Sequence, residues 1–91
     1  MCRNIQTLHN IDPPTTLDEI HSAALQFVRK VSGMQRPSQA NEAVFGEAVE
    51  AVARATERLL GALVTSAPPR DRVAEANRRR ARAAERFGRV A

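Results

Sequence analysis

The sequence predicts an all-α protein, a small three-helix bundle with a short N-terminal arm or helical turn packed on it. Three segments carry apolar residues at helical spacing, and each is bounded by residues that start or stop helices. No segment alternates apolar and polar residues as a half-buried strand does. A chain of 91 residues suits one domain. We therefore expect residues 1–91 to form a single helical domain, with the arm at 1–15 and helices at about 17–32, 38–64 and 70–87.

The first helix is predicted over residues 17–32. Thr16 and Glu19 have the spacing of a capping box, in which each side chain accepts a hydrogen bond from the other residue's backbone N–H. Gly33 provides a C-terminal stop, because glycine readily adopts the left-handed conformation that ends helices. The apolar residues of one face follow at helical spacing: Leu17, Ile20, Ala24, Phe27, Val28 and Val31.

The second helix is predicted over residues 38–64, with Ser38 as its N-cap. Its polar residues occupy only about a third of the helix circumference at the standard turn angle: Glu47, Glu50, Arg54, Glu57 and Arg58. A helix with so narrow a polar face is expected to be covered on two sides. We therefore predict that this helix is the central one of the bundle.

The third helix is predicted over residues 70–87, following Pro68-Pro69. Its apolar side is mostly alanine: Val73, Ala76, Ala83, Ala84 and Phe87. Burial of alanine removes little apolar area from water, so this helix is expected to be the least stable of the three. In the N-terminal arm, apolar residues recur every third position, as in a short helical turn: Cys2, Ile5, Leu8 and Ile11.

Several short blocks resemble a small bacterial family defined as domain of unknown function 2277. They are Met1 to Ile5 (MCRNI), Pro13-Pro14, Ala24 to Lys30 (ALQFVRK) with Ser32-Gly33, Pro37-Ser38 with Asn41, and Ala67 to Arg70 (APPR). His9 stands where an aromatic residue is expected in relatives, so no site is built on it. The resemblance implies a bacterial protein and brings with it no reaction, cofactor or partner.

Positive charge is concentrated at the C-terminal end. From Arg70 onward the chain has eight arginines against three acidic residues, whereas the first 69 residues carry six bases and seven acids. The predicted polyanion-binding residues lie along the third helix and its tail: Arg72, Arg78, Arg79, Arg82, Arg86 and Arg89. The partner would be a nucleic acid or an acidic protein. Without Tyr or Trp, base stacking is disfavoured. The alternative is a solvated helix face in an arginine-rich composition.

A second basic group surrounds the turn before the second helix. Arg29, Lys30 and Arg36 lie near Ser38, where free backbone N–H groups at a helix start attract anions. A phosphate or carboxylate is the predicted ligand. The alternative is that Ser38 and Asn41 only cap the helix.

Cys2 is the single cysteine, so no internal disulfide or two-cysteine zinc signature exists. Removal of Met1 would leave Cys2 as the amino terminus, where an amine beside a thiol can chelate a metal or act as a nucleophile. Cys2 is therefore the weak candidate for a catalytic or metal-binding role, and the alternative is simple packing with Ile5 and Leu8. His9 and His21 show no ligand spacing with Cys2, and no metal or other cofactor is expected.

Other function classes lack their motifs. The sequence contains no Gly-x-Ser-x-Gly nucleophile motif and no glycine-rich phosphate loop, so a self-contained enzyme is not expected. Neither a membrane-spanning run nor an apolar leader is found, which predicts a cytoplasmic protein without a membrane partner. A third hypothesis is a homo-oligomer or subunit, in which alanine-rich faces complete a shared core.

Overall fold

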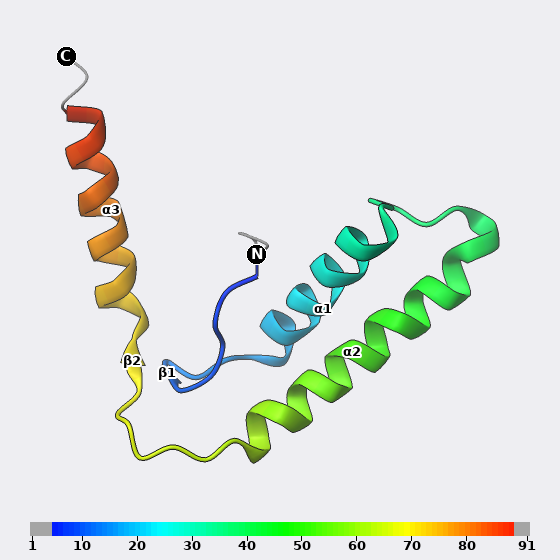
Figure 1. Ribbon diagram of the computed structural model, residues 1–91, viewed down its shortest axis with the longest axis horizontal. Coiled ribbons are helices and arrows are strands. Elements are labelled where there is room, and N and C mark those ends of the chain that lie inside the picture. The colour runs from blue at the N-terminus through cyan, green and yellow to red at the C-terminus, as the bar shows by residue number, and fades with distance from the viewer. Residues whose placement is uncertain (1–4, 89–91) are drawn as a thin grey trace.

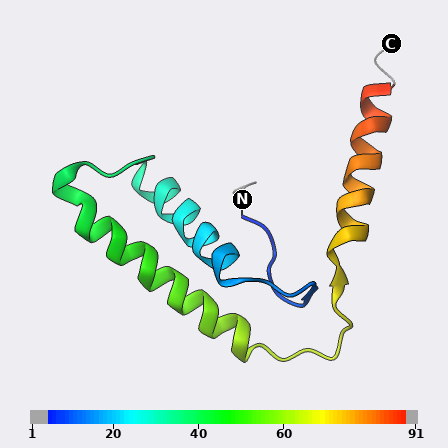
Figure 2. The same cartoon turned by 180° about the vertical axis from the view of Figure 1, so that it is seen from behind.

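The computed structural model describes the backbone of residues 5–88 and the side chains of residues 5–86 (Figure 1). Its elements are β1 (Ile11–Asp12), α1 (Leu17–Ser32), the 3₁₀-helix η1 (Gln39–Asn41), α2 (Glu42–Ala62), β2 (Arg70–Asp71) and α3 (Arg72–Gly88). α1 and α2 lie side by side as an antiparallel hairpin. α3 stands apart from this hairpin in both views, with the N-terminal segment between them (Figures 1 and 2).

α1 spans Leu17–Ser32, and both end signals of the sequence form hydrogen bonds in the structure. The Glu19 N–H donates to Thr16 Oγ1 at 3.2 Å, and the Thr16 N–H donates to Glu19 Oε1 at 3.0 Å. At the other end Gly33 has a φ of 72°, and its N–H donates to the Arg29 carbonyl at 3.0 Å. Local hydrogen bonds therefore define this helix at both ends.

α2 is shorter than predicted. The segment begins with η1, and the α-helix starts at Glu42 and ends at Ala62. Ser38 takes the N-cap position of η1, but its side chain makes no capping bond to the backbone. Instead the Asn41 side-chain amide donates to Ser38 Oγ at 2.8 Å.

The core lies between α1 and α2. Its buried residues are Ile20, Ala24 and Val28 from α1 with Val49 and Ala53 from α2. At the solvent edge of this contact, His21 Nε2 lies 2.8 Å from Glu50 Oε1, so this histidine has a polar partner on the facing helix.

The structure corrects the prediction that α2 is sandwiched in a three-helix bundle. α2 is covered by α1 on one side, and three large apolar side chains of α2 and the residue after it stay exposed: Val44, Leu59 and Leu63. α3 covers none of this face (Figure 2). The physical reason lies in α3, where Arg80 follows Val73 by two helical turns and interrupts the alanine-rich side. Packing that side against α2 would bury a guanidinium.

The structure also contains a short β-ladder, which the sequence does not predict. β1 and β2 pair in parallel, with Ile11 beside Arg70 and Asp12 beside Asp71. Each strand has only two residues, which is too short to show an alternating pattern. Within the described part of the chain, no helix is long and apolar enough to cross a membrane.

Candidate functional site

The structure places two features next to each other at α3. The first is a set of contacts that ties the start of α3 to the N-terminal segment and to α1, here called the junction: Asn10, Pro13, Glu19, Arg70 and Arg72. The second is the basic face, the exposed arginines on one side of α3 farther along the helix: Arg78, Arg79, Arg82 and Arg86.

Asn10 makes the backbone part of the junction. It has a positive φ of 55°, a conformation that asparagine tolerates better than most residues. Its carbonyl accepts a hydrogen bond from the Arg70 N–H at 2.9 Å. Its side-chain amide donates to the carbonyls of Ala67 and Pro68, each at 3.2 Å. One residue thus holds the loop that leads into α3.

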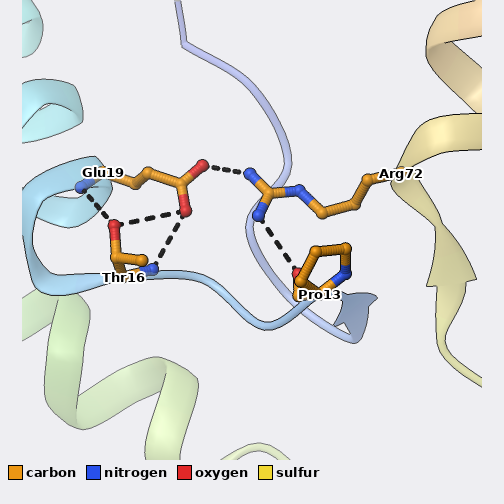
Figure 3. Close-up of polar contacts among 4 residues, drawn as sticks. All are labelled: Pro13, Thr16, Glu19 and Arg72. Atoms are coloured by element: carbon orange, nitrogen blue, oxygen red, sulfur yellow. Dashed lines mark hydrogen bonds and ion pairs between the residues drawn. The ribbon is translucent and has the colours of Figure 1, made fainter.

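Arg72 makes the ionic part of the junction (Figure 3). It extends from α3 and donates through Nη2 to Glu19 Oε2 on α1, and through Nη1 to the Pro13 carbonyl at 3.1 Å. Oε1 of Glu19 accepts from the backbone and hydroxyl of Thr16. Glu19 therefore completes the capping box of α1 and anchors α3 at the same time.

The first turn of α3 has local supports of its own. Asp71 Oδ1 accepts from the Ala74 N–H at 3.0 Å, which is the geometry of an N-cap. Arg70 Nε lies 3.9 Å from Glu75 Oε1. Acidic side chains here also suit the positive end of the helix dipole. The first turn of α3 is thus supported by local contacts as well as by the junction.

The junction lowers the pKa of Glu19 below its ordinary value of 4.5. The largest cause is the hydrogen bond from Arg72, followed by the backbone hydrogen bond from Thr16. Because the pKa is lowered in the folded state, this stabilisation is complete above the unfolded-state pKa and is lost as pH falls through the folded-state value. The contact between Glu19 and Arg72 is therefore expected to be intact at neutral pH and to weaken in acid.

The Glu19→Gln variant tests this pH dependence. Glutamine can still serve the capping box, so the variant removes mainly the charge facing Arg72. We expect Glu19→Gln to unfold more easily than the unmodified protein at neutral pH. The two proteins should converge as pH falls below 4.5, measured by urea unfolding at a series of pH values. A difference that persists undiminished in strong acid would contradict the assignment.

An open cleft of about 520 Å³ adjoins the junction, between the N-terminal segment, α1 and α3. Its walls carry both signs of charge, with Asp18 and Glu19 facing Arg72 and Arg79. Among the residues that line this cleft, no polar or charged side chain is buried. The cleft therefore lacks the desolvated polar groups that select a particular small ligand.

The predicted polyanion-binding residues divide into two groups. Arg72 serves the junction, whereas Arg78, Arg79, Arg82 and Arg86 are exposed on α3. Arg80, also exposed, donates to Asn77 Oδ1 one turn before it. Arg89 lies outside the described residues.

The other predicted site residues lie elsewhere. Arg29 is held by a hydrogen bond from its Nε to the Gln35 carbonyl at 3.0 Å, while Lys30 and Arg36 are exposed. Ser38 begins the three-residue η1 rather than α2. Cys2 lies outside the described residues. Among the described side chains, no group of three or more His, Cys, Asp or Glu residues is arranged to hold a metal ion.

Sequence reasoning missed the role of Asn10 and the pairing of Glu19 with Arg72. Glu19 was recognised for its capping box and Arg72 for its charge. Their contact joins residues 53 positions apart, and no local pattern reports such a pairing. The one local signal was Asn10 itself, since asparagine before a proline-rich turn favours a left-handed residue.

Fold and site together define a small helical protein in which a two-helix hairpin carries a separately anchored basic helix. Residues 1–78 match the family described as an uncharacterized conserved protein, DUF2277, and the chain belongs to this family. No curated protein and no solved structure matches the chain. The matched range includes the whole junction but ends at Arg78, before most of the basic face.

Proposed function

We propose that α3 binds the phosphate backbone of a nucleic acid. The observation that carries the proposal is the position of α3, which is anchored at its first turn and otherwise stands apart from the hairpin (Figure 1). Arg78, Arg82 and Arg86 are therefore accessible to a large partner, since none of them lines the cleft that holds Asp18 and Glu19.

The spacing of these arginines supports the same partner. Arg78, Arg82 and Arg86 follow each other at intervals of four residues, so they project from one side of α3 about 6 Å apart along its axis. A guanidinium group donates two parallel hydrogen bonds to a phosphate, which suits repeated backbone contacts. Phosphate contacts carry no sequence information. We therefore expect binding with little preference for base sequence.

Fluorescence anisotropy with a labelled DNA duplex tests the proposal in low salt. The triple variant Arg78→Gln, Arg82→Gln, Arg86→Gln is compared with Arg36→Gln, Arg54→Gln, Arg58→Gln, which removes the same number of exposed charges from the hairpin. We expect the α3 variant to bind at least about 10-fold more weakly and the hairpin variant to change much less.

Two results would overturn the proposal. The first is absence of binding to both DNA and RNA duplexes at low salt. The second is an equal loss of affinity in the two triple variants, because this would show a response to net charge rather than to a face of α3.

A further inference from the structure

We propose that the apolar groove between α1 and α2 docks against the same groove of a second copy of this chain. The inference goes beyond the proposed function and does not depend on it. In the resulting symmetric dimer, two hairpins would form a four-helix core, and an α3 would extend from each chain.

The groove runs along the hairpin on the side where α1 and α2 meet. Near the turn it forms an apolar hollow of about 300 Å³, with Phe27 and Val31 on one wall and Val44 and Val52 on the other. Phe27 and Val52 also line a neighbouring hollow of about 270 Å³, which continues toward Leu60. Ile5 and Leu8 of the N-terminal segment border that second hollow. Among the described residues, none from the N-terminal segment lines the hollow near the turn.

On α2 the groove belongs to a longer apolar stripe. Its members recur every three or four residues over the length of the helix: Val44, Ala48, Val52, Ala55, Leu59 and Ala62. This is the spacing at which side chains of one helix interdigitate with those of another. Val44 is 61% exposed and Leu59 56% exposed, so the stripe lacks a partner helix.

The chain exposes more surface than a compact monomer of its size does, so it has area to bury against a partner. The chain exposes 7327 Å², whereas a compact monomer of 10.0 kDa exposes about 5,200 Å². The excess of about 2,100 Å² includes the surface of the separated α3 as well as the groove, and it is larger than the ~800 Å² that each partner buries in a standard interface. The radius of gyration of 16.8 Å likewise exceeds the ~12 Å of a compact chain of this length.

A second hairpin fits the groove better than α3 does. The junction anchors the first turn of α3 away from the groove, and Arg80 interrupts its apolar side. The groove near the turn, in contrast, is lined mainly by apolar side chains and can face its own copy without burying a charge. In a two-fold interface the same patch serves both partners, so one uncovered stripe is sufficient.

Light scattering after size exclusion, together with sedimentation at several concentrations, tests the proposal on the full chain. We expect a dimer with twice the mass of 10.0 kDa. The double variant Val44→Glu, Leu59→Glu should weaken dimerisation by roughly 10²-fold or more, because each interface would then bury four unpaired carboxylates. The matched control Leu17→Glu, Val64→Glu changes two side chains that are 66% and 95% exposed outside the groove, and should remain dimeric.

A third variant, Val73→Glu, alters the apolar side of α3. It therefore distinguishes a second hairpin from α3 as the occupant of the groove. The dimer should persist in Val73→Glu if the hairpins meet each other. Dissociation by Val73→Glu would overturn the proposal in favour of α3 as the occupant. A monomeric unmodified protein, or a dimer unaffected by the groove variant, would also overturn it. Far-UV circular dichroism confirms folding, and Val44→Ser, Leu59→Ser replaces the glutamate variant if that variant unfolds.

Discussion

Raising the salt concentration from 50 to 200 mM is expected to weaken DNA binding by the order of 10²-fold. Four exposed arginines of α3, Arg78, Arg79, Arg82 and Arg86, can each neutralise one phosphate. Each neutralised phosphate releases counterions, so the logarithm of the binding constant should fall with the logarithm of salt concentration at a slope of about −3.6. Anisotropy titrations at four or five salt concentrations measure this slope directly.

The α3 triple variant supplies the control for this salt dependence. Losing Arg78, Arg82 and Arg86 should flatten the slope by about 2.7. The hairpin variant should keep a slope close to that of the unmodified protein. Equal slopes in all three proteins would contradict a phosphate interface on α3.

Replacing Ile20 by alanine is expected to lower the free energy of unfolding by about 2–5 kcal/mol. Ile20 is 5% exposed and packs in a core of very few buried residues, all from α1 and α2. A small domain has only a few kcal/mol of net stability to lose. Ile20→Ala should therefore be largely unfolded at room temperature, as measured by far-UV circular dichroism and urea titration.

Leu17→Ala is the matched control, one helical turn earlier on α1. Leu17 is 66% exposed, so its truncation removes little buried area and should change the unfolding free energy by less than about 1 kcal/mol. Similar losses in both variants would show that the core does not lie where the structure places it.

Elements held by local hydrogen bonds were predictable from the sequence. The ends of α1 depend on Thr16, Glu19 and Gly33, whose signals act within a few residues of each end, and the structure forms both caps. The start of α2 was less predictable, because Ser38 and Asn41 bond to each other and a 3₁₀ turn intervenes. The sequence therefore predicts which segments are helical, and it predicts a helix end only where local capping bonds form.

The placement of α3 was not predictable in the same way. A helical wheel shows that Val73 and its neighbouring alanines share a side, but it gives no weight to Arg80 among them. The contacts that place α3 join Asn10 to the loop before it and Arg72 to α1. Such contacts join residues that are far apart in the sequence and depend on how the chain folds back. Sequence patterns that span a few residues therefore cannot predict them.

The candidate site was predicted in part. The concentration of charge on the last helix is a property of composition, so it can be predicted from the sequence, and the structure shows these arginines exposed. Arg72 was grouped with them because its charge is the same, although the structure gives it a partner in Glu19. Charge alone could not separate an anchoring arginine from those left for a ligand.

The central claim is that α3 stands apart from the hairpin, and a distance between spin labels on α2 and α3 tests it most directly. Labels at Glu47 and Arg82, in a chain with Cys2 replaced by serine and diluted with unlabelled protein, report distances within one chain. Our account predicts a separation well beyond the ~8–10 Å between the axes of packed helices, even allowing for label length. A dominant population at the short separation of packed neighbours would contradict it.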